Sequence, residues 1–161
     1  GRWALVIAAD VPVTILDHAG QLKVALEAAK NAGLEGRVKG VEMNLLDHSR
    51  PFPEGHDAVW MSQFLCCFAL DDVEALLRRG ARALAKDGRL YVLDTFWDRQ
   101  TSPVARYCLH ATSLYFTCMA NGTSRMYAAD DVLCCVKKAG LVVEEALALG
   151  TSHTLLVCRR G

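Results

Sequence analysis

The sequence lacks several features that would assign it to a class at once. None of its apolar runs approaches the roughly 20 residues that a membrane-spanning helix needs, and no positively charged segment precedes a cleavable apolar stretch. It has no run of basic residues, and its 18 Lys and Arg are balanced by 18 Asp and Glu. We therefore expect a soluble, cytoplasmic protein that has neither a membrane nor a nucleic acid as its partner.

Recognisable metal or disulfide patterns are also missing. The seven cysteines include two adjacent pairs, Cys66-Cys67 and Cys134-Cys135, but no Cys-x-x-Cys spacing. Four of the five histidines are scattered without metal-ligand spacing: His18, His48, His56 and His153. We expect no metal site and no disulfide framework. Because free cysteine behaves largely as a small apolar residue, we expect reduced thiols in apolar surroundings.

Strand-like and helix-like patterns alternate along a chain long enough for one domain, with 161 residues of which 52% are hydrophobic. The patterns predict helices over residues 4–9, 20–32, 71–84 (capped by an aspartate), 104–119 and 129–139, with Gly33 and Gly140 as stops. They predict strands over residues 13–16, 38–46, 57–64 (buried), 89–95, 141–149 and 153–158. This order favours an α/β fold with a doubly wound, mostly parallel sheet that ends in an antiparallel hairpin.

One acid stands at a position of special interest. The apolar run over residues 13–16 stops at Asp17, with a helical pattern on either side. Nucleotide-cofactor folds present a carboxylate to a ribose at the end of a strand in this way. The strand and glycine-rich turn that should precede such an acid are not in the sequence, so we expect the chain to begin inside this unit.

Several local sequences resemble the class I S-adenosylmethionine-dependent methyltransferases, particularly the small-molecule O-methyltransferases of plants and of bacterial secondary metabolism. The matching segments are Gly1-Arg2-Trp3-Ala4, Leu16-Asp17 with Gly20-Gln21-Leu22, Asn44-Leu45-Leu46-Asp47, residues 57–68, residues 86–90 with the Asp94 strand, and residues 121–125. The resemblance implies one Rossmann-like S-adenosylmethionine-binding methyltransferase domain over residues 1–161. It lacks the family's first strand, most of its glycine loop and its N-terminal helical domain. That domain usually forms the dimer, so the resemblance implies a homodimer for the full-length protein.

The resemblance also implies which residues bind the cofactor. Six positions match: Gly1, Asp17, Asn44, Leu45, Ser62 and Gln63. Asp17 would accept the ribose hydroxyls, with a plain strand-end or helix-capping acid as the alternative. Asn44 and Leu45 would flank the adenine, and a turn-forming Asn is the alternative for Asn44. Ser62 and Gln63 would line the methionine end of the cofactor.

The catalytic base departs from the plant pattern. The plant enzymes have a histidine, an acid and a tryptophan after the fourth strand, where this chain reads Cys66-Cys67-Phe68. A thiol beside an apolar strand has a raised pKa and is a poor replacement. Asp94 matches the acid after the family's fifth strand, and the second family acid is replaced by Ser124. His110 on the 104–119 helix is the predicted general base, and Asp94 is the second predicted catalytic residue, which would orient His110 or the substrate. The alternative for His110 is a solvent-facing place in the polar stripe Arg106, His110, Ser113 and Thr117.

Three functional classes are compatible with these residues. The leading one is an S-adenosylmethionine-dependent O-methyltransferase acting on a phenolic or polyketide-like hydroxyl of a small molecule. Trp97, Tyr115 and Met119 would line a planar substrate, unless they belong to the core. The second class is an inactive cofactor-binding or assembly module, and the third is a NAD-dependent dehydrogenase, because Asp17 alone does not distinguish the two cofactors. The terminal hairpin and the Asn44 segment favour a methyltransferase over a dehydrogenase.

Overall fold

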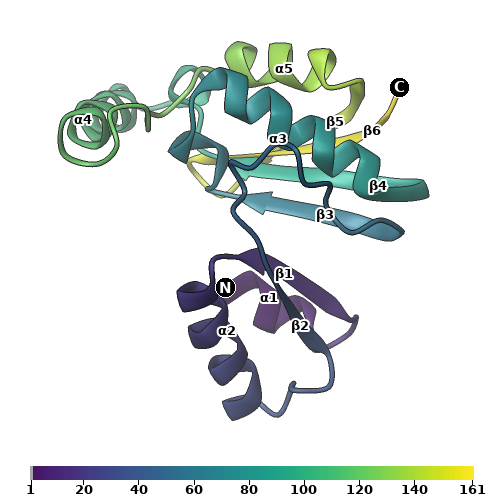
Figure 1. The fold of residues 1–161 in the computed structure, drawn as a ribbon. Coiled ribbons are helices and arrows are strands. Elements are labelled where there is room, and N and C mark those ends of the chain that lie inside the picture. The colour runs from purple at the N-terminus through teal and green to yellow at the C-terminus, as the bar shows by residue number, and fades with distance from the viewer. Residues whose placement is uncertain (1) are drawn as a thin grey trace. The chain divides into compact units, whose positions relative to one another are not determined.

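The structure, a computed structural model, describes residues 2–161. The chain divides after Ser49 into two compact units, and each unit has its own sheet (Figure 1). The first unit has two strands and the second has four. Both contain helices as well as strands, so the predicted α/β class is confirmed.

The first unit contains α1 (Arg2–Ile7), β1 (Val13–Asp17), α2 (Ala19–Asn31) and β2 (Val38–Glu42). β1 and β2 pair in parallel, with Asp17 opposite Glu42. The core consists of buried Ala8, Ala29 and Val38, against which Leu5, Val13, Ile15 and Leu34 pack. As predicted, Gly33 follows the end of α2, and its φ of 71° suits glycine. The predicted 38–46 strand is too long, because the chain turns at Asn44.

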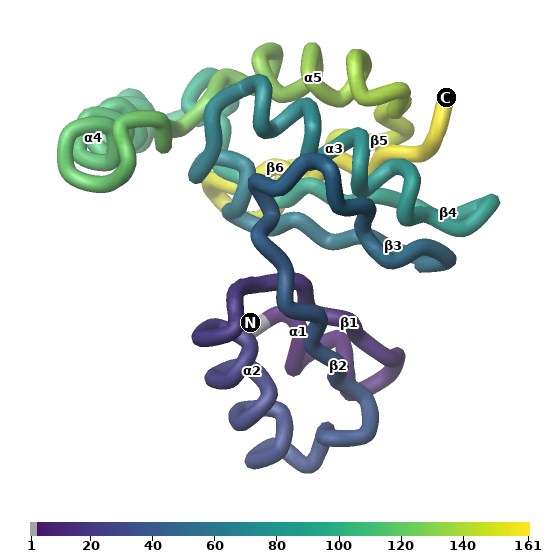
Figure 2. The backbone as a smooth tube through the Cα atoms, in the orientation of Figure 1, coloured from purple at the N-terminus to yellow at the C-terminus, as the bar shows by residue number. Residues whose placement is uncertain are grey.

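The second unit contains β3 (His56–Ser62), the short 3₁₀-helix η1 (Leu65–Cys67), α3 (Leu70–Ala83), β4 (Leu84–Asp94), the 3₁₀-helix η2 (Trp97–Arg99), α4 (Pro103–Met119), α5 (Ala129–Lys138), β5 (Leu141–Leu149) and β6 (His153–Arg160). The strand order is β3-β4-β6-β5. β3 and β4 are parallel, whereas β6 is antiparallel to both β4 and β5. The chain folds back between β5 and β6 (Figure 2), which confirms the predicted hairpin.

The core of the second unit lies between the sheet and the helices α3 and α5, which lie side by side on one of its faces (Figure 1). Its largest fully buried side chains are Phe96, Leu65, Leu76, Leu77, Leu90, Leu156, Val73, Val92, Val132, Val136 and Cys158. Gly80 lets α3 approach the sheet, because a Cβ atom there would lie 2.7 Å from Leu90 Cδ1. The apolar stripe of α3 and the central strands therefore form one packed layer.

Several local expectations are wrong. No aspartate caps α3, because its N-cap is Ala69; Asp71 instead lies in the first turn, where a negative charge suits the helix dipole. β3 is an edge strand with exposed Asp57, not a strand buried on both faces. β4 begins at Leu84, earlier than the predicted strand. Among the cysteines of the described chain, which are all free thiols, Cys66, Cys135 and Cys158 are buried as expected but Cys67, Cys108, Cys118 and Cys134 are exposed.

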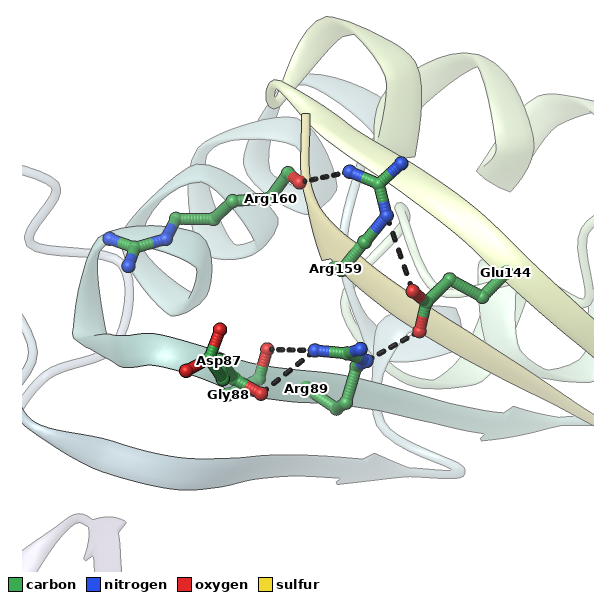
Figure 3. A network of polar contacts seen from close by, with 6 residues as sticks. All are labelled: Asp87, Gly88, Arg89, Glu144, Arg159 and Arg160. Carbon is green, nitrogen blue, oxygen red and sulfur yellow. Dashed lines mark hydrogen bonds and ion pairs between the residues drawn. The ribbon is translucent and has the colours of Figure 1, made fainter.

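A charged network joins the last three strands of the sheet (Figure 3). Glu144 on β5 pairs with Arg89 on β4 and, at 3.2 Å, with Arg159 on β6. The Arg89 guanidinium also donates to the carbonyl of Asp87 at 2.8 Å. Glu144 lies where the β5–β6 register shifts. The network therefore ties the edge strand β5 to its neighbour β6 and to the next strand, β4, at an irregular point of the hairpin.

Candidate functional site

Three strands of the second unit bring polar residues to one edge of its sheet. β3 and β4 are parallel and end at Ser62 and Asp94. Gln63 follows β3 directly, and its N–H donates to the carbonyl of Leu93 at 2.8 Å. The antiparallel strand β6 begins at His153, one residue before the position that pairs with Asp94. The carboxyl ends of parallel strands are where open α/β sheets bind ligands, so this edge is the candidate site.

Asp94 is the most buried acid of this edge, with 5% of its surface exposed. One carboxylate oxygen accepts the N–H of Thr95 at 2.9 Å, and the backbone N–H of Cys66 donates to the same carboxylate. Burial raises the pKa of Asp94 to about 6, although both hydrogen bonds and the nearby His153 oppose the rise. The group is therefore ionised at neutral pH, at a cost in folding energy.

Gln63 has an unusual backbone conformation. Its φ is 47°, and it is the only non-glycine residue among residues 2–161 with a positive φ. The side-chain nitrogen Nε2 lies 2.9 Å from Nε2 of His153. Left-handed backbone at a non-glycine residue is costly and is often found at functional sites. The turn after β3 thus holds an exposed amide against the first residue of β6.

The Cys66-Cys67 pair follows on η1. A hydrogen bond with Cys67, burial and the charge of Asp94 raise the pKa of Cys66 far above its ordinary value. The same hydrogen bond lowers the pKa of the exposed Cys67 to about 7. The expectation of a raised thiol pKa is therefore right for Cys66 and wrong for Cys67. Their carbonyls accept hydrogen bonds from Arg125, Asn121 and Ser124, so the 121–125 turn fixes this loop.

The helix that carries His110 is separate from Asp94. α4 has no buried residue, and it projects beyond the end of the sheet (Figure 1). The ring of His110 lies 4.9 Å from that of Trp97. Within the described chain, no hydrogen bond or ion pair joins His110 to Asp94. The structure therefore does not bring the two predicted catalytic residues into direct contact.

The three residues predicted to line the substrate are also separated in the structure. Trp97 on η2 is partly buried, whereas Tyr115 and Met119 on α4 are 61% and 72% exposed. These two side chains are not core residues. In the predicted stripe, the hydroxyl of Thr117 donates to the carbonyl of Ser124 at 3.2 Å, so the stripe is not simply solvent-facing.

In the first unit, Asp17 ends β1 and is partly buried. Its carboxylate accepts the N–H of His18 at 2.8 Å, which orients it at the carboxyl end of a parallel strand. Asn44 forms a turn, since its side-chain oxygen accepts the N–H of Leu46 at 3.1 Å. Leu45 is partly exposed within that turn. Gly1 lies outside the described residues.

His153 was not among the residues that sequence reasoning selected. It appears in the sequence as one of several scattered histidines, and only the pairing of β6 with β4 places it near Asp94.

Among residues 2–161, no group of three or more His, Cys, Asp or Glu side chains is arranged to hold a metal ion. No helix in this part of the chain has both the length and the apolar character to cross a membrane.

The fold resembles that of several solved O-methyltransferases. An O-methyltransferase family protein from Burkholderia thailandensis superposes with a TM-score of 0.77 at 22% identity, over 92% of this chain and 43% of that one. A putative O-methyltransferase from Nostoc punctiforme gives a TM-score of 0.80 at 23% identity, over 96% of this chain and 48% of that one. The O-methyltransferase of neocarzinostatin biosynthesis, in complex with S-adenosylmethionine and a hydroxynaphthoic acid, gives 0.77 at 22% identity, over 94% and 42%.

The chain spans less than half the length of each of these proteins. No curated relative matches it. The sequence model of a family described as a methyltransferase domain matches residues 1–92, which is more than half of the chain. This match includes β1 with Asp17, the turn at Asn44 and the Cys66-Cys67 loop. The chain therefore belongs to the methyltransferase domain family.

Proposed function

We propose that the protein is an S-adenosylmethionine-dependent O-methyltransferase that acts on a phenolic or polyketide-like hydroxyl of a small molecule. The observation that carries the proposal is the family match over residues 1–92, which includes the acid at the end of β1. Solved neighbours support the substrate class: one is a mitomycin 7-O-methyltransferase, and others are complexes with 1,4-dihydroxy-2-naphthoic acid or apigenin. The two bound molecules are hydroxylated ring systems.

The residues of the chain fit the proposed cofactor in chemistry. A carboxylate such as Asp17, oriented at a strand end, suits the two hydroxyls of a ribose. The Asn44-Leu45 turn would flank the adenine, and Ser62 and Gln63 would line the methionine end. S-adenosylmethionine would supply an electrophilic methyl group. The chain then has to align a substrate oxygen behind that methyl carbon and remove the hydroxyl proton.

Asp17 gives the most direct test of the cofactor assignment. We expect Asp17→Ala to weaken S-adenosylmethionine binding by roughly 1.5 to 3 kcal/mol, through loss of charge-assisted hydrogen bonds. Isothermal titration calorimetry measures this as a rise in Kd of about 10- to 100-fold. Glu27→Ala, which removes an exposed carboxylate from α2 of the same unit, is the matched control.

Two results would contradict the assignment. An Asp17→Ala Kd equal to that of the wild type would remove Asp17 from the cofactor site. Tighter binding of NAD than of S-adenosylmethionine would favour the dehydrogenase alternative.

A homodimer formed through a further helical domain stays a prediction from the family resemblance.

One observation favours an inactive module as the second candidate. The position of the family histidine holds Cys66, which is buried and has a raised pKa, so it does not replace a general base. Release of S-adenosylhomocysteine in the presence of 1,4-dihydroxy-2-naphthoic acid or apigenin separates the two candidates. Turnover supports the enzyme, whereas tight cofactor binding without turnover of any such acceptor supports the module.

A further inference from the structure

His153 offers a basic nitrogen at the candidate site. Its Nε2 lies 2.9 Å from the side-chain nitrogen of Gln63, and its Nδ1 lies 3.2 Å from Oγ of Ser152. Because an amide nitrogen only donates hydrogen bonds, Nε2 of His153 is the acceptor in this arrangement and the ring proton is on Nδ1. A neutral imidazole with a lone pair at Nε2 is the form that a general base requires.

The other histidines of the second unit are less well placed. His56 begins β3 and lies at the amino end of that strand, away from Ser62. His110 packs on Trp97 from the exposed helix α4. Only His153 begins a strand beside the last residue of β4, where it interacts electrostatically with Asp94. Asp94 also accepts the backbone N–H of Cys66, the position where the family base is missing, so this carboxylate links His153 to that position.

The surroundings of His153 hold it in place. The buried amide of Gln100 donates to the carbonyl of Ser152 at 2.9 Å and to that of Phe96 at 2.8 Å. This fixes the residue just before His153. By contrast, Gln63 is exposed, so a ligand can reach its amide contact with His153.

One buried carboxylate lies among the groups around the imidazole. Asp94 on β4 supplies a negative charge, and the Cys66 and Cys67 thiols lie next to it on η1. The cations of the neighbouring segments are Arg106 on α4, which donates to the carbonyl of Gln100, and Arg99 on η2. On β5, the residue that pairs with His153 is the uncharged Leu149. A buried carboxylate close to a histidine stabilises the imidazolium that proton transfer produces.

We propose that His153 is the proton acceptor of the methyl transfer proposed above, and that it serves in place of the base that Cys66 does not provide. The substrate hydroxyl takes the place of the Gln63 amide at Nε2. Its proton passes to Nε2 as the new bond between oxygen and methyl carbon forms and the bond between that carbon and sulfur breaks. Asp94 then balances the imidazolium charge.

The test uses S-adenosylmethionine with 1,4-dihydroxy-2-naphthoic acid as the acceptor and measures S-adenosylhomocysteine release as a function of pH. We expect His153→Gln to lower kcat by about 100-fold or more at neutral pH, with the Kd for S-adenosylmethionine unchanged. The loss shrinks as pH rises, because the acceptor hydroxyl then ionises without help. His56→Gln, at the other end of the sheet, is the control and keeps the wild-type rate.

Each other outcome overturns the proposal. A loss that stays constant at every pH indicates a structural role for His153, and no loss indicates no role. A large loss in His110→Gln with an active His153→Gln would assign the base to α4 instead.

A second measurement separates this proposal from the proposed function. If the wild type neither binds S-adenosylmethionine nor turns over the acceptor, the proposed function fails. The pair itself is tested by NMR of the His153 ring nitrogens at one fixed pH in the wild type and in Asp94→Asn. We expect their chemical shifts to change in the variant, and unchanged shifts would refute the pairing.

Discussion

Asp94→Asn is expected to make the protein more stable at high pH while it removes a charge from the candidate site. Asp94 is 5% exposed, and burial raises its pKa from 3.8 to about 6. Between these two values the folded protein holds a proton that the unfolded chain has already released. Stability therefore falls as pH rises through this window and stays lower above it. An uncharged amide in the same place does not carry this penalty.

The size of the effect follows from the shift in pKa. A shift of about two pH units corresponds to about 3 kcal/mol of lost stability at high pH. The carboxylate accepts the N–H groups of Thr95 and Cys66, whereas asparagine offers one acceptor oxygen instead of two. That loss costs about 1 to 2 kcal/mol at every pH. We expect a net gain of about 1 to 2 kcal/mol at about pH 8.

Urea denaturation of the wild type and the variant at several pH values measures this difference. The stability difference should grow by about 2 kcal/mol in favour of the variant between about pH 4.5 and about pH 8. Asp87→Asn, at an exposed position of β4, should leave the pH dependence unchanged. If the Asp94→Asn difference does not vary with pH, the carboxylate is not buried as the structure places it. A gain in stability with a loss of turnover would mark Asp94 as a functional residue.

Two further predictions test the packing and the thiol chemistry of the second unit. Gly88→Ala should destabilise the protein by about 1 to 3 kcal/mol in urea denaturation, because its Cβ would lie 2.8 Å from the backbone oxygen of His56; wild-type stability would contradict the close approach of β3 and β4. Iodoacetamide at about pH 7.5 should modify Cys67 before Cys66 in a mass-spectrometric time course, because Cys67 is exposed and its pKa is lowered to about 7. Modification of Cys66 first would contradict the assigned hydrogen bond between the two thiols.

The sequence was sufficient for the features that depend on neighbouring residues. The apolar spacing and the stop at Gly33 locate α2 within about one residue, and Gly140, with a φ of 78°, ends the α5 segment as predicted. The hairpin of β5 and β6 follows from two apolar runs with a short turn between them. Asp17 at the end of its strand is equally local. Helix periodicity, turns and hairpins need only contacts between residues close in sequence.

Tertiary structure decided how the strands and loops meet. Burial cannot be assigned to β3 from its apolar pattern, because its place at the edge of the four-stranded sheet depends on which strands pair with it. The start of β4 at Leu84 is set by pairing with His56, and not by its own sequence. In the same way, the sequence led to His110 as the partner of Asp94, whereas β6 places His153 there. Hydrogen bonds between strands join residues far apart in the chain, so these juxtapositions have no local signature.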